Sequence, residues 1–182
     1  MTRTGDICMV GITCDYGITI AMRSHEYSLY HLGDHIYCCA RAFAGDIFVD
    51  IKNQLAAQYL NQNLKIPVKK AQELLWQLYP DIATDPVLLA AQENNRQYLY
   101  ATQLDGSCTD NNHVAVSGRG TAIAEAMDWL TKNWDRNQDP MMSEVMARKV
   151  LQNWDTFQNT STEVIFLYRR MEDAALDTDD SK

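Results

Sequence analysis

The sequence predicts an α+β fold of four layers (αββα), in which helices cover both outer faces of two stacked antiparallel sheets. Two observations favour this class. Apolar runs of strand length alternate with pairs of amphipathic helices, and the apolar period changes between 2 and 3.6 residues accordingly. The expected order is strands, two helices, strands, two helices and a final strand. We expect one domain over residues 1–170 and an acidic, disordered tail over residues 171–182.

The first half of the chain predicts two hairpins followed by two helices. The first hairpin turns at Asp15-Tyr16-Gly17 and the second at Gly33-Asp34. The expected strands are 7–14, 18–24, 27–32 and 35–42, and the expected helices are 44–61 and the segment from Pro67 to the residue before Pro80. The adjacent Cys38 and Cys39 should point to opposite faces of their strand.

The second half changes period twice. Strands at 87–91 and 97–103 should pair through Glu93-Asn94-Asn95, and Asp105-Gly106 should turn into a strand at 114–116. Two helices follow, over 121–134 and 143–154, and Ser143 with Glu144 suits the start of the second one. The last expected strand is 162–168.

Composition excludes several classes of function. A net charge of -8 gives no electrostatic attraction to nucleic acid or anionic membrane. No apolar run approaches the roughly 20 residues that span a bilayer, and the first residues lack the apolar core of a signal peptide. We therefore expect a protein of the cytoplasm and nucleus, with neither nucleic acid nor membrane as a partner. The cysteines are odd in number and favour a structural role: Cys8, Cys14, Cys38, Cys39 and Cys108.

No cofactor or metal site is expected. His31 and His35 flank a turn that contains Asp34, and His25 lies nearby, but no carboxylate or cysteine pattern completes a metal-binding set. Ser117-Gly118-Arg119-Gly120 lacks the lysine of a phosphate-binding loop. The remaining conspicuous residues have structural interpretations, which are helix packing for Trp76, Trp129, Trp134 and Trp154 and solvated faces for Lys69-Lys70 and Arg169-Arg170.

Five fragments, in order, carry a family resemblance. They are Thr4-Gly5, Asp15–Ala21 (DYGITIA), Ile36–Asp46 (IYCCARAFAGD), Val116–Thr121 (VSGRGT) and Thr160–Phe166 (TSTEVIF). With this spacing, the chain resembles a proteasome β subunit, most closely the trypsin-like β type, over nearly all of residues 4–168. The resemblance implies the fold of N-terminal-nucleophile hydrolases and assembly with other proteasome α and β subunits into stacked rings that degrade proteins.

In that family an N-terminal threonine acts as nucleophile and base, assisted by a lysine, an aspartate and a serine-aspartate cluster. Carried onto this chain, the nucleophile position falls on Ile7, or on Asp6 if the Thr4-Gly5 junction is matched. The other positions also lack the required residues: Arg23 replaces the aspartate, Ser28 is near the lysine position, Arg119 replaces the serine, and Thr156 with Asp155 is near its partner aspartate. The first lysine of the chain is Lys52.

Two residues near the start of the chain are candidate substitutes for the nucleophile. Thr2 lies about five residues too early, which displaces its hydroxyl by on the order of 16 Å. Cys8 has the opposite strand parity, so its side chain should point to the other face of the sheet. We therefore predict no catalytic, cofactor-binding or metal-binding residues.

The expected function is that of a non-catalytic β-type subunit, which contributes to the core particle of ubiquitin-dependent protein degradation through subunit contacts. Two alternatives stay open. One is an active threonine-type endopeptidase subunit. The other is a divergent paralogue that acts outside the ring as a protein-interaction module, which the short segment between Arg23 and Ile36 and the short C-terminal tail favour.

Overall fold

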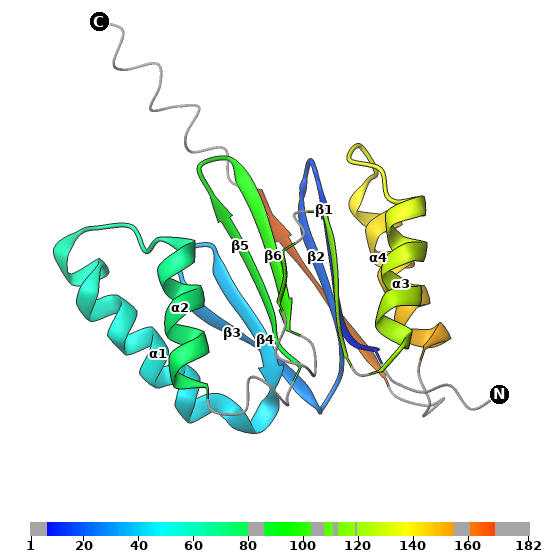
Figure 1. Cartoon of the computed structure of the whole chain (residues 1–182). Coiled ribbons are helices and arrows are strands. Elements are labelled where there is room, and N and C mark those ends of the chain that lie inside the picture. The colour runs from blue at the N-terminus through cyan, green and yellow to red at the C-terminus, as the bar shows by residue number, and fades with distance from the viewer. Residues whose placement is uncertain are drawn as a thin grey trace, which may run out of the picture.

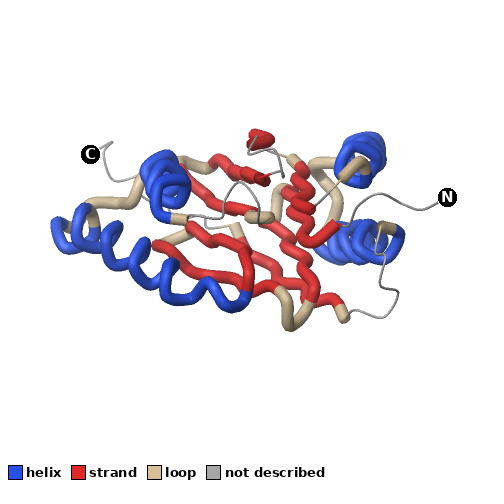
Figure 2. The backbone as a smooth tube through the Cα atoms, turned by 60° about the horizontal axis from the view of Figure 1, so that its bottom comes forward, coloured by secondary structure: helices blue, strands red, loops and turns tan. Residues whose placement is uncertain are grey.

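The protein folds into the four predicted layers, as its computed structural model shows (Figure 1). The structure describes residues 7–79, 86–102, 108–110, 113–118, 120–154 and 161–169, with the backbone alone for 108–110. Two antiparallel sheets stack face to face, and a pair of helices covers each outer face (Figure 2). The fold-class prediction is confirmed.

The first sheet has four strands in the order β8-β1-β2-β9. Their bounds are Ile7–Cys14 for β1, Gly17–Arg23 for β2, Val114–Gly118 for β8 and Thr162–Tyr168 for β9. The predicted β1–β2 hairpin is confirmed, with Met9 opposite Met22. Its turn requires Gly17, because a Cβ at that φ of 153° would collide with the backbone carbonyl of Leu167 in β9.

The second sheet has five strands in the order β3-β4-β5-β6-β7. Their bounds are Tyr27–Gly33 for β3, Ile36–Arg41 for β4, Leu88–Glu93 for β5, Arg96–Thr102 for β6 and Cys108–Asp110 for β7. Both predicted hairpins of this sheet are confirmed. The β5–β6 turn uses Asn94 and Asn95 at φ values of 51° and 63°, which asparagine tolerates well.

Helices α1 (Gly45–Gln58) and α2 (Val68–Leu78) cover the five-stranded sheet, and α3 (Ala122–Asn133) and α4 (Pro140–Asn153) cover the four-stranded one (Figure 1). Short 3-10 turns, Ala42–Ala44 and Leu60–Gln62, lie at either end of α1. Each interface between layers has its own apolar core. The core under α1 and α2 includes Cys38, and the core between the sheets includes Cys39. The two cysteines therefore point to opposite faces of β4, as predicted.

Two predicted helix boundaries are wrong, and one strand was not predicted. Helix α1 ends at Gln58 rather than at residue 61, because the chain tightens into the 3-10 turn. Helix α4 begins at Pro140 rather than at Ser143: the Asp139 carboxylate accepts a hydrogen bond from the Met142 N–H and caps the helix. The short strand β7 was not predicted. The Asp105-Gly106 turn lies outside the described residues.

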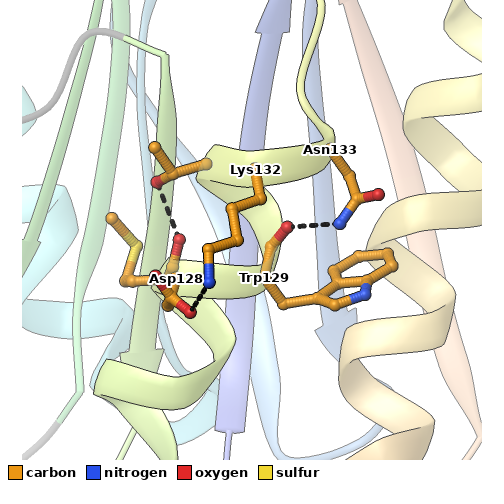
Figure 3. A network of polar contacts seen from close by, with 6 residues as sticks. Asp128, Trp129, Lys132 and Asn133 are labelled. Carbon is orange, nitrogen blue, oxygen red and sulfur yellow. Dashed lines mark hydrogen bonds and ion pairs between the residues drawn. The ribbon is translucent and has the colours of Figure 1, made fainter.

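The four tryptophans pack against the cores, as predicted: Trp76 of α2 packs against the core under α1 and α2, and the others pack on the α3–α4 side. The indole of Trp134 also donates to the Thr13 carbonyl at 2.7 Å. The outer surface of α3 is polar, where Lys132 forms an ion pair with Asp128 at 2.8 Å and Asn133 donates to the Trp129 carbonyl (Figure 3). Such exposed contacts contribute little to stability.

Candidate functional site

The start of β1 is the position that the sequence resemblance assigns to the nucleophile. Ile7 pairs with Gly118 of β8 and has no exposed surface. Its backbone N–H approaches the Trp154 carbonyl at 3.4 Å, and its side chain packs into the core under α3 and α4. This position therefore holds an apolar side chain in a ladder, rather than a hydroxyl facing solvent.

Cys8 points the other way, into the core between the sheets, as its strand parity predicts. Its neighbours there include Tyr27 and Cys39, and the Cys39 thiol lies 3.6 Å from the Met22 sulfur. Burial raises the pKa of the Cys39 thiol, and burial with the nearby Cys8 raises the pKa of the Tyr27 hydroxyl. Because thiolate is the nucleophilic form of cysteine, the raised pKa makes Cys39 inert at neutral pH.

Arg23 ends β2 at the position that the resemblance assigns to the aspartate. It is 4% exposed and lies opposite Thr162 in β9. A guanidinium stays protonated and has no acceptor atom, so it cannot take the proton that a carboxylate would accept. The replacement reverses the charge at this position.

Ser28 stands near the position of the family's lysine. It pairs with Ala40 in the β3–β4 ladder, and its hydroxyl forms a hydrogen bond with Tyr30. The Tyr30 hydroxyl in turn donates to the Arg41 carbonyl at 2.7 Å, and its ring stacks on Phe48 at 4.2 Å. These contacts fix the start of β3 on α1 and supply no ammonium group.

A cation–π contact between Arg41 and Tyr27 lies at the same end of the sheets and was not predicted from the sequence. The guanidinium carbon of Arg41 lies 5.5 Å from the centroid of the Tyr27 ring, and the two residues are directly paired across β3 and β4. The hairpin register would have predicted this cation–π contact. It is an arrangement that stabilises the hairpin.

The other residues assigned by the resemblance fall on positions that the structure does not describe. Asp6, Arg119, Asp155 and Thr156 lie outside the described residues, as do Thr2 and the Thr4-Gly5 junction. The tail over 171–182 and Arg170 also lie outside them.

A cavity of about 530 Å³ lies at the opposite end of the sandwich. The strand β1 has eight residues and is about 23 Å long, and the Cys14 carbonyl at its far end accepts a hydrogen bond from Gln97 in the cavity wall. Arg169 also lines this cavity and donates to the Asn95 carbonyl at 3.3 Å. The cavity is therefore separate from the site at the start of β1.

His25, His31 and His35, the three histidines that invite a metal-binding interpretation, do not form a cluster. His31 stacks on Tyr37 with ring centroids 4.8 Å apart, His35 lines the cavity beside Asp34, and His25 lies in the β2–β3 turn at a φ of 69°. Within the ranges that the structure covers, no three histidine, cysteine, aspartate or glutamate side chains gather closely enough to hold a metal ion.

The fold defines a class: an αββα sandwich of two antiparallel sheets with a pair of helices on each outer face. A sequence model of the family described as "Proteasome subunit" matches residues 3–167. The chain belongs to the proteasome subunit family. Family membership supports a role in the proteasome core, in protein degradation, and implies assembly with other proteasome subunits.

A search of curated proteins found no match to this chain. Among the helices in the described ranges, none combines the length and the apolar character needed to cross a membrane.

Proposed function

We propose that the chain is a non-catalytic subunit of the proteasome core, of the β type and most similar to the trypsin-like subunits, which acts through contacts with its neighbours. The observation that carries this proposal is the fully buried Ile7 at the nucleophile position. Two further positions agree with it, since Arg23 reverses the charge at the position assigned to the aspartate and burial keeps the Cys39 thiol protonated.

Threonine catalysis in this family uses a free amine and a hydroxyl on the same residue, with reacting groups placed to within about 1 Å. Ile7 supplies no hydroxyl, and its N–H approaches a carbonyl of the helix layer. The adjacent Cys8 thiol lies on the other face of the sheet. Neither residue can replace an N-terminal threonine.

Helix α4 offers a contact surface for a neighbouring subunit. Met141, Met142 and Val145 are large apolar residues near its start, and Met141 and Val145 are 75% and 58% exposed. Positions 141 and 145 are one helical turn apart and share a face. We propose that a neighbouring subunit covers this face, because burial of apolar surface is the main drive for stable association.

The test is affinity purification of the native chain, with the mass of its complex measured by size exclusion. The proposal predicts that the chain elutes with other proteasome subunits in a large particle. The amount of the double variant Met141→Lys/Val145→Glu recovered in the particle should be at least about tenfold lower than that of the native chain, because the variant buries charge in the contact. The control Lys132→Ala changes only an exposed ion pair on α3 and should be incorporated normally.

Two results would overturn the proposal. A native chain that elutes only near its 20.8 kDa monomer mass or as a small oligomer is not a resident subunit. It would then be the divergent paralogue acting as an interaction module. A mature chain in the particle that begins with Thr2 or Cys8 would instead favour an active endopeptidase. Because we propose that the chain is part of proteasome particles, we also propose that it is located in the cytoplasm and the nucleus.

A further inference from the structure

The strand β9 lies at the edge of the four-stranded sheet, where it pairs antiparallel with β2. The register is continuous from Arg23 opposite Thr162 to Gly17 opposite Tyr168. On its other side, β9 pairs with no strand in the described part of the chain. A strand in this position presents backbone groups that another strand can bind.

The hydrogen bonds at both ends of the ladder show which backbone groups face outward. The Ser24 N–H donates to the Ser161 carbonyl, and the Arg169 N–H donates to the Tyr16 carbonyl, each at 2.9 Å. In an antiparallel pair such residues alternate, so the odd-numbered residues of β9 bond to β2. The N–H and carbonyl groups of Thr162, Val164, Phe166 and Tyr168 therefore point to the free edge.

This edge lacks most features that keep edge strands apart. The segment Thr162–Tyr168 (TEVIFLY) has no proline and no lysine, and its pairing with β2 has no bulge. Five of its seven residues are β-branched aliphatic, leucine or aromatic side chains that suit a strand. Tyr168 is 78% exposed, and its ring meets Phe166 edge-on at 4.9 Å.

We propose that the isolated chain forms a symmetric dimer in which β9 of one copy pairs antiparallel with β9 of a second copy, centred on Phe166. Centring on Phe166 places position 163 opposite position 169. Glu163 of each copy then faces Arg169 of the partner subunit, so two opposite-charge pairs close the two ends of the ladder. The inference goes beyond the proposed function and does not depend on it.

The neighbouring register is less favourable. Centring on Ile165 would place Glu163 opposite Leu167, leaving the carboxylate beside an apolar partner. The Phe166 register also places Val164 opposite Tyr168, and Phe166 opposite itself. These even-numbered residues share one face of the sheet, the face on which Val164 packs towards α3 and α4.

The Phe166 register would form about six inter-copy backbone hydrogen bonds, two for each outward-facing pair. The Tyr168 carbonyl also accepts a hydrogen bond from the Gln92 side chain at 3.0 Å, but a carbonyl has a second lone pair for the ladder. Residues 171–182 suit this edge less well than a second β9 does, since they are rich in aspartate and alanine, which are depleted from strands.

The first test measures the mass of the isolated chain by light scattering over a concentration series. We expect a dimer of twice 20.8 kDa. Glu163→Arg and Arg169→Glu alone should each raise the dimer dissociation constant by at least about tenfold, because like charges then face each other. The double variant restores opposite charges and should restore the dimer. The control Lys132→Glu changes charge on α3, away from the edge, and should leave the dimer unchanged.

Cysteine cross-linking tests the register. Under mild oxidation, Phe166→Cys should give a covalent dimer, since the two copies of residue 166 are directly opposite and about 5.5 Å apart at Cα. Ile165→Cys should not, because its own counterpart is offset. Preferential cross-linking at 165 would overturn the register. A wild-type chain that stays monomeric at every concentration, with its β9 amides still protected from hydrogen exchange by β2, would overturn the dimer.

Discussion

At Ile7, the chain keeps the pairing and packing of its first strand but has no nucleophilic group in the side chain. The strand, its pairing with β8 and its packing against the helix layer are all present at this residue. An apolar side chain strengthens that packing, whereas a nucleophile would have to face an open site. The residue therefore stabilises the fold at the position that the resemblance assigns to the nucleophile.

Replacing Ile7 by Thr tests this interpretation. The new hydroxyl would be buried in an apolar core, so we expect a loss of about 1–3 kcal/mol in unfolding free energy beyond that of the matched variant Ile7→Val. Ile7→Val removes only a methylene group and should cost about 0.5–1.5 kcal/mol. Urea unfolding of both variants measures the difference. Equal stabilities would show that position 7 is open to water.

The two buried thiols of β4 predict how stability depends on pH. Burial raises the pKa of Cys38 and of Cys39, so the folded state binds these protons more tightly than the unfolded state does. The contribution of these two thiols to the unfolding free energy is therefore complete below the unfolded-state pKa of about 8.5, and it declines as pH rises above that value.

We expect the unfolding free energy to fall by up to about 1.4 kcal/mol per pH unit for each thiol above pH about 8.5. Cys38→Ala and Cys39→Ala are less stable overall but should each show a shallower alkaline slope. Chemical unfolding between neutral and alkaline pH measures these slopes. A slope that neither variant changes would assign the alkaline loss to other groups, such as Tyr27, whose pKa is also raised.

At the scale of elements, α4 depends on a cap that the sequence pattern did not reveal. Asp139→Ala removes the acceptor for the Met142 N–H at 2.8 Å and should cost about 0.5–2 kcal/mol in unfolding free energy. The control Glu144→Ala removes an exposed ion pair with Arg148 and should cost about 0.5 kcal/mol or less. Thermal or urea unfolding distinguishes them. A larger effect at Glu144 would mean that the helix begins near Ser143.

The elements themselves were largely predictable. Alternation and turn residues gave both N-terminal hairpins, and strand parity gave the opposite faces of Cys38 and Cys39. The sequence predicts too late a start for α4 because Ser143 also suits a helix start, yet its side chain is buried and accepts a hydrogen bond from Gln138. The local sequence could not show that tertiary contact.

The candidate site was predictable only in part. The resemblance gave the positions of Ile7, Arg23 and Ser28, and parity gave the direction of Cys8. The contact of Tyr27 with Arg41 and the thiol–thioether pair of Cys39 with Met22 depend on which strands face one another. Likewise, the free edge of β9 depends on strand order, which a sequence pattern does not specify.

At the scale of the whole molecule, the chain has the architecture of its family. Its cavity and its exposed apolar helix face both lie away from the position that the resemblance assigns to the nucleophile. The cavity lies at the far end of the sheets, and the apolar face of α4 lies on an outer layer. The core under α3 and α4 includes Ile7, the residue that the resemblance assigns to the nucleophile position. This arrangement agrees with a subunit that acts by assembly.

The most direct test is the intact mass of the chain, isolated from its native complex after treatment with an electrophilic peptide probe that alkylates N-terminal threonine. The proposed function predicts no cleavage that exposes a new N-terminal threonine or cysteine, and no added mass from the probe. Active threonine subunits in the same sample serve as the positive control. A shortened chain that begins with threonine or cysteine and carries the probe would contradict the account.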